Sequence, residues 1–141
     1  MKRSLVLIAN AAKARICEFI MDEGSAEPQL TRQKTILNPQ GRGKWARGRG
    51  EAGGAEIGPG GSRGADREGF ARELSEILSA NYRDTKFEAL VLVASPAFLG
   101  KLRRSLSIEL QRHVVHSIPK DYTAIRPEFL GLLLWPRLLP A

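Results

Sequence analysis

Glycine is distributed very unevenly along this chain of 141 residues. Ten of its 14 glycines lie between Gly41 and Gly64, and residues 40–65 contain only two large apolar side chains, Trp45 and Ile57. Glycine at this density loses too much backbone entropy on ordering to form a packed element. We therefore expect a long flexible loop at 40–65 and a compact core built from the glycine-poor segments on either side.

Two apolar runs, at residues 5–9 and 14–21, precede this loop. In the second run, apolar side chains fall on both faces of an extended chain, which is typical of strands covered on both sides in a layered α/β domain. The four residues between the runs fit a hairpin. Residues 30–37 are more polar and predict a third strand at an edge of the sheet.

The segment after the loop alternates helical and extended patterns. Asp66 is placed to cap a helix that runs to about Asn81 and carries an apolar stripe at helical spacing. The continuous apolar run 89–94 predicts a fully buried, parallel strand. The stripe of the helix consists of Phe70, Ala71, Leu74, Ile77 and Leu78.

Ser95 and Pro96 supply an N-cap and a proline at the first position of the next helix. In this helix Phe98, Leu99, Leu102 and Leu106 are predicted to face inward, and Lys101, Arg103 and Arg104 outward. A short helix at 108–112, a strand at 114–118 and a last helix at 127–134 complete the pattern. Together the elements predict a single α/β domain over residues 1–141, with a mixed sheet and helices on both of its faces.

The charge balance favours a polyanionic partner. The chain has 22 Lys and Arg against 15 Asp and Glu, a net charge of +7, which suits RNA, DNA, ribosomes or anionic membrane surfaces. Its one cysteine, Cys17, excludes an internal disulfide and suits a reducing cytosol.

The apolar start breaks at Asn10, so we expect a buried strand rather than a secretory signal. The apolar tail 129–139 is too short to span a bilayer. We expect a cytoplasmic protein.

The loop also carries the candidate RNA-binding residues. Arginine offers forked donors to phosphate, glycine lets the backbone approach a nucleic acid strand, and a tryptophan can stack on an unpaired base. The alternative interpretation of the same residues is a solvated low-complexity linker. The candidates are Arg42, Lys44, Trp45, Arg47 and Arg49 in the loop, its glycines Gly41, Gly43, Gly48 and Gly50, and the outward residues Lys101, Arg103 and Arg104.

Signatures of other chemistries are missing from the sequence. No Gly-Lys-Ser/Thr follows the loop glycines, so a P-loop NTPase is not supported. His113 and His116 have no accompanying ligand cluster, and Cys17 lies in an apolar run where a thiol is inert packing. We therefore predict no catalytic residue, no metal and no cofactor.

Four stretches together resemble the bacterial host attachment protein family, described as required for bacterial attachment to host cells. The most specific is Ala-Ser-Pro-x-Phe-Leu-Gly-x-Leu-Arg at 94–103. The others are Ala-Arg-Ile at 14–16, Phe-Ala-x-x-Leu at 70–74 and Lys-Asp-Tyr-Thr at 120–123. The resemblance covers almost the whole chain. That family is similar in turn to the middle domain of archaeal and eukaryotic class 1 peptide-chain release factors and of Pelota.

This resemblance implies a ribonuclease H-like α/β fold of the translational-machinery type, with the long loop where release factors carry Gly-Gly-Gln. In those factors the loop enters the peptidyl-transferase centre, and the glutamine helps to position the hydrolytic water. Here Gly53-Gly54 is followed by Ala55, and Gly60-Gly61 by Ser62. The catalytic tripeptide is therefore not matched.

The leading hypothesis is a release-factor-like module that contacts ribosomal RNA or tRNA through the loop and the basic helix, and that positions rather than catalyses. A second hypothesis is a protein-interaction module without RNA binding, with the apolar tail 132–139 as a surface for docking or self-association. A third is a weak esterase or peptidyl-tRNA hydrolase that uses the loop backbone.

Overall fold

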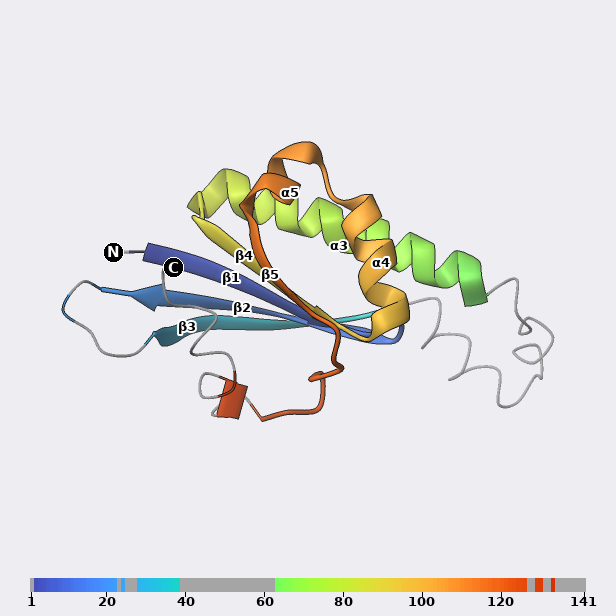
Figure 1. The fold of residues 1–141 in the computed structure, drawn as a ribbon, viewed down its shortest axis with the longest axis horizontal. Helices are drawn as coiled ribbons and strands as arrows, with labels where there is room; N and C mark the ends of the chain where they lie inside the picture. The colour runs from blue at the N-terminus through green and yellow to red at the C-terminus, as the bar shows by residue number, and fades with distance from the viewer. Residues whose placement is uncertain are drawn as a thin grey trace.

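A five-stranded sheet forms the centre of the computed structural model, which describes residues 2–22, 24, 28–38, 63–126, 129, 130 and 133, and only the backbone of residues 63–66. Figure 1 shows the sheet with its helices packed against it. The elements in chain order are β1 (Lys2–Ala9), β2 (Lys13–Met21), β3 (Gln29–Leu37), α3 (Arg63–Thr85), β4 (Ala89–Ala94), α4 (Pro96–Ser105), α5 (Ile108–His113) and β5 (Val114–Ile118).

The strands lie in the order β3-β2-β1-β4-β5. β1 pairs antiparallel with β2 and parallel with β4, β2 pairs antiparallel with β3, and β4 pairs parallel with β5. The sheet is therefore mixed, as the sequence predicted, and the polar strand β3 lies at an edge. The predicted hairpin joins β1 to β2, where the amide of Asn10 donates to the carbonyl of Lys13 at 2.9 Å.

Apolar side chains are buried on both faces of the central strands. Leu5, Leu7, Leu90 and Leu92 pack with α3, α4 and α5 in one core cluster. Their neighbours Val6, Ile8, Val91 and Val93 form a second cluster with Cys17, Phe19, Ile118 and Leu130. In Figure 1, the helices α3, α4 and α5 all lie on the same face of the sheet. This double burial confirms the prediction made from the apolar runs.

The opposite face is covered by the segment that follows β5. Tyr122, Ile125 and Leu130 pack there against the second cluster. The sequence predicted helices on both faces, with the last one at 127–134. Of that range the structure describes Phe129, Leu130 and Leu133, which have helical backbone. Among the described residues, this face is therefore covered largely by the irregular segment that contains Tyr122 and Ile125.

α3 is longer than its apolar stripe predicted. It begins at Arg63, so Asp66 lies inside the helix rather than at its N-cap, and residues 63–65 belong to the helix rather than to the loop. It ends at Thr85, and Tyr82 packs edge-to-face on Phe87 just beyond this end, with ring centroids 5.2 Å apart. Lys86 then adopts a left-handed conformation with φ 52° and donates its amide to the carbonyl of Tyr82, which stops the helix.

Candidate nucleic-acid interface

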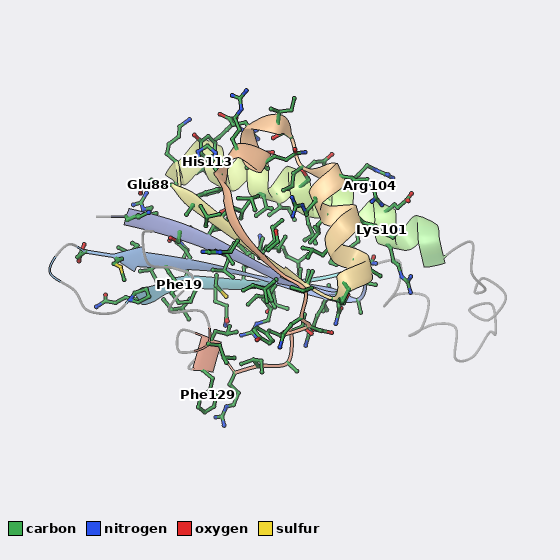
Figure 2. The ribbon with its side chains drawn as sticks, viewed as in Figure 1. Phe19, Glu88, Lys101, Arg104, His113 and Phe129 are labelled. Carbon is green, nitrogen blue, oxygen red and sulfur yellow. The ribbon has the colours of Figure 1, made fainter. Side chains whose placement is uncertain are left out.

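Three of the predicted binding residues, Lys101, Arg103 and Arg104, lie together on α4, and we call them the α4 basic surface. Phe98 and Leu102 of the same helix are buried against the sheet. Helical periodicity therefore turns the basic residues toward solvent. Figure 2 shows Lys101 and Arg104 on the outer side of α4. The sequence predicted this orientation correctly.

Lys101 is the only member of this surface with an ion pair among the described residues. Its Nζ lies 3.7 Å from Oε2 of Glu68, on the neighbouring helix α3. Within the described part of the chain, no carboxylate oxygen lies within 4.0 Å of a nitrogen of Arg103 or Arg104. Among the described residues, the charges of the two arginines are therefore not neutralised by an ion pair.

The two arginines are held in different ways. Nη1 of Arg103 donates to Oγ of Ser117 on β5, at 3.3 Å, which directs this side chain toward the edge of the sheet. Arg104 lies along its own helix, and its Nη1 would be 3.5 Å from a Cβ on Gly100. At this distance a Cβ would make an ordinary van der Waals contact, so the guanidinium of Arg104 lies beside the turn that contains Gly100.

A hollow of about 320 Å³ opens beside these two arginines, and we call it the α4–β5 hollow. Leu106 and Val114 form its apolar floor, and both pack against the core. Nε2 of Gln111 donates to the carbonyls of Leu106, at 2.9 Å, and of Arg103, at 3.3 Å. The hollow is lined by Arg103, Arg104, Leu106, Gln111 and Val114.

The loop candidates lie outside the described residues. These are Arg42, Lys44, Trp45, Arg47 and Arg49, with the glycines Gly41, Gly43, Gly48 and Gly50. The described residues that flank the loop can be placed. Asn38 donates its amide to the carbonyl of Ala12, in the turn at the end of β1, at 2.9 Å. α4 follows β4, which is parallel to β1, so α4 begins at this same end of the strands.

A polar cluster at this end of the strands was not predicted from the sequence. Nδ2 of Asn10 donates to Oδ2 of Asp121 at 2.9 Å and to Oγ1 of Thr123 at 3.1 Å. The hydroxyl and the amide of Thr123 both donate to Oδ1 of Asp121. Burial opposes ionisation of Asp121, but these hydrogen bonds and the charge of Lys13 outweigh it and lower the pKa of that carboxyl. The signal for the cluster was the polar Asn10 directly after an apolar strand.

A buried arginine was also missed. Arg15 is only 6% exposed, and its Nη1 donates to the carbonyls of Thr123, at 3.3 Å, and Ile125. Its Nη2 donates to Oε1 of Gln33 at 2.8 Å. The guanidinium thus ties the hairpin strand β2 to the segment after β5. The sequence showed an arginine within an apolar run, but not the carbonyls that receive it.

Cys17 and His113 lie in structural surroundings. Burial raises the pKa of the Cys17 thiol to about 11, and the charge of Arg15 only partly opposes this effect. Nδ1 of His113 donates to the carbonyl of Glu109 at 2.9 Å, and its ring packs on Tyr82. Among the residues described here, no three His, Cys, Asp or Glu side chains are grouped to hold a metal ion. No helix in this part of the chain is long and apolar enough to cross a membrane.

These features define a single α/β domain with a basic helical surface beside a shallow hollow. The family described as "Protein required for attachment to host cells" matches residues 5–132. Because this match spans most of the chain, the protein belongs to that family, as the sequence motifs indicated. No protein among the curated ones matches the chain.

Solved structures with a similar arrangement have low sequence identity. A Ppx/GppA phosphatase of Aquifex aeolicus matches with 12% identity and a TM-score of 0.46, over 84% of this chain and 36% of its own. The ethanolamine utilization protein EutJ from Carboxydothermus hydrogenoformans matches with 10% identity and a TM-score of 0.44, over 86% of this chain and 45% of its own. The chain thus spans less than half the length of these structures. The likeness to release-factor middle domains stays a prediction.

Proposed function

We propose that this member of the attachment family is a cytoplasmic module that contacts RNA through the α4 basic surface and the Arg/Gly-rich loop. Ribosomal RNA and tRNA are the proposed partners, as in the release factors that its motifs resemble. The loop has no Gly-Gly-Gln tripeptide, so the module positions RNA rather than hydrolysing an ester. The family description names a phenotype, and RNA contact would be the molecular event beneath it.

One observation carries this proposal: Arg103 and Arg104 lie side by side in sequence on the outer side of α4, without a carboxylate among the described residues to neutralise them. Guanidinium groups bind phosphate through two parallel hydrogen bonds, which makes arginine well suited to an RNA backbone. The chain's net charge of +7 adds a long-range attraction for a polyanion.

The described residues on either side of the loop support a continuous surface. Asn38, which follows β3, is bonded to Ala12 in the turn after β1, at the end of the strands where α4 begins. Arg63 opens α3, and α3 is joined to α4 by the pair of Glu68 and Lys101. One RNA strand can therefore contact the loop and α4 together.

Binding of a short unstructured RNA, followed by fluorescence anisotropy at low salt, tests the proposal. Alanine at both Arg103 and Arg104 is expected to weaken binding, because two phosphate contacts are lost. The charge-matched control places alanine at Lys34, on the opposite edge of the sheet, and at Arg83, in the last turn of α3. Equal effects of the two double variants would overturn the α4 assignment. Sedimentation with ribosomes at low and high salt then tests ribosomal RNA as the partner.

A protein-interaction module is the second candidate, and one observation favours it. On the face of the sheet opposite α4, Phe129 and Leu133 are 49% and 39% exposed and line a hollow of about 500 Å³ with Ile125. In Figure 2 the side chain of Phe129 points away from the sheet. Exposed apolar surface often marks a protein contact. This candidate predicts that Phe129→Ser abolishes self-association in analytical ultracentrifugation and leaves RNA affinity unchanged.

A further inference from the structure

We infer that the α4–β5 hollow is a subsite for one unpaired nucleotide, with the phosphate held by Arg103 and Arg104 and the base lying over Leu106 and Val114. The inference rests on the proposed function in its choice of RNA as the ligand, and it assigns the place where a single nucleotide is held. The volume of the α4–β5 hollow, about 320 Å³, lies at the lower end of the ~300–1,000 Å³ found for small-molecule sites.

The phosphate end of the subsite is defined by the two guanidinium groups. Each arginine has five N–H donors, and Arg103 uses one of them for Ser117. No side-chain hydrogen bond or ion pair of Arg104 is found among the described residues. Both side chains line the same hollow, so two guanidinium groups with unused donors are available there to a phosphate.

The base end is defined by a floor that exists before any ligand binds. Leu106 is 5% exposed and belongs to the main core cluster, and Val114 packs against that cluster. Because the core already holds these two side chains in place, little conformational entropy is lost when the flat face of a base lies on them.

Gln111 adds a polar group at the rim. Because its Nε2 is bonded to the carbonyls of Arg103 and Leu106, the amide is held in one orientation. Its Oε1 is then the acceptor that remains for an N–H on the edge of a base. The hollow therefore offers donors for a phosphate, an apolar surface for the face of a base, and an amide acceptor for the edge of that base.

The test is a titration of the whole chain with AMP, followed by amide chemical shifts, with adenosine and inorganic phosphate as separate probes. We expect saturable AMP shifts at Leu106, Gln111 and Val114. Adenosine and phosphate should each bind about tenfold or more weakly than AMP, because each provides only one end of the ligand. Shifts scattered over the surface, or phosphate binding as tightly as AMP, would overturn the nucleotide assignment.

A charge-matched pair of variants separates this subsite from general attraction. Arg104→Ala should weaken AMP binding about tenfold or more, whereas Arg112→Ala, on the exposed side of α5 and outside the hollow, should bind AMP as the wild type does. Equal weakening in both variants would contradict the inference. If RNA binds through α4 but the AMP shifts are scattered, the nucleotide subsite is contradicted and the proposed function stands. AMP binding in the hollow without RNA binding would remove the proposed function and keep the nucleotide site.

Discussion

Replacement of Arg15 by methionine tests how the segment after β5 is held on the sheet. The change keeps an apolar stem of similar length and removes the guanidinium. It leaves the carbonyl of Thr123, a buried residue, and the carbonyl of half-buried Ile125 without their donor, whereas Gln33 is exposed and can turn to water. A buried acceptor without a partner costs about 1–3 kcal/mol.

One buried and one half-buried acceptor therefore predict a net loss of about 2 kcal/mol in the free energy of unfolding, since removing the buried charge offsets part of the cost. Urea denaturation measures this loss. Hydrogen exchange locates it, because the amide of Ile125 donates to the carbonyl of Tyr122 at 3.0 Å and should lose protection. Arg72→Met, on the exposed side of α3, is the control and should change stability by less than about 0.5 kcal/mol. A variant at Arg15 as stable as that control, with Ile125 still protected, would refute the reasoning.

The remaining predictions concern the core, α4 and the loop. Leu92→Asp should unfold the domain in circular dichroism, because Leu92 is fully buried in the interior strand β4 and an unpaired buried charge costs several kcal/mol; an unchanged melting curve would contradict this. Gly100→Ala should stabilise the protein by about 0.5–1 kcal/mol, since alanine favours the helix and its Cβ would meet only ordinary contact at 3.5 Å from Arg104; a lower melting temperature would show that this contact is too close. Trp45→Ala should weaken RNA binding by about 1–3 kcal/mol with little change in its salt dependence, and equal affinity would exclude stacking. Alanine at all four loop cations, Arg42, Lys44, Arg47 and Arg49, should instead flatten the slope of log RNA affinity against log salt by up to about 3. An unchanged slope would show that these cations do not contact RNA.

The strands and their burial could be predicted from the sequence because the pattern is local. In β1, Leu5 and Leu7 point to one face and Val6 and Ile8 to the other, and all four are buried. A strand that is apolar at every position has to be covered on both sides. The sequence therefore located the centre of the sheet without any knowledge of its neighbours.

Helix ends depended on contacts that no local pattern contains. α3 continues beyond Asn81 to Thr85, where the left-handed Lys86 stops it and Tyr82 packs on Phe87. The predicted N-terminal boundary was also wrong, since Asp66 is a good cap residue but the helix begins three residues before it. The covering of the second face was predicted only in part, because Tyr122 and Ile125 pack there without belonging to a helix.

The sequence predicted which charged residues lie on the outer side of α4, but not the residues that surround them. Periodicity placed Arg103 and Arg104 on the outer side of α4, as observed. The hydrogen bond from Arg103 to Ser117 spans 14 residues of sequence. The hydrogen bonds from Gln111 to the carbonyls of Arg103 and Leu106 depend on how α5 packs next to α4. Such pairings are set by tertiary structure, so the hollow could not be found before the fold.

The salt dependence of RNA binding tests the central claim most directly. Fluorescence anisotropy with a short unstructured RNA, repeated at several salt concentrations, gives the slope of log affinity against log salt. Each phosphate contact to a single strand contributes about −0.7 to this slope. Alanine at Arg103 and Arg104 should therefore flatten it by up to about 1.4, whereas alanine at Lys34 and Arg83 should leave it unchanged. A slope that is the same for both double variants would contradict RNA contact through α4.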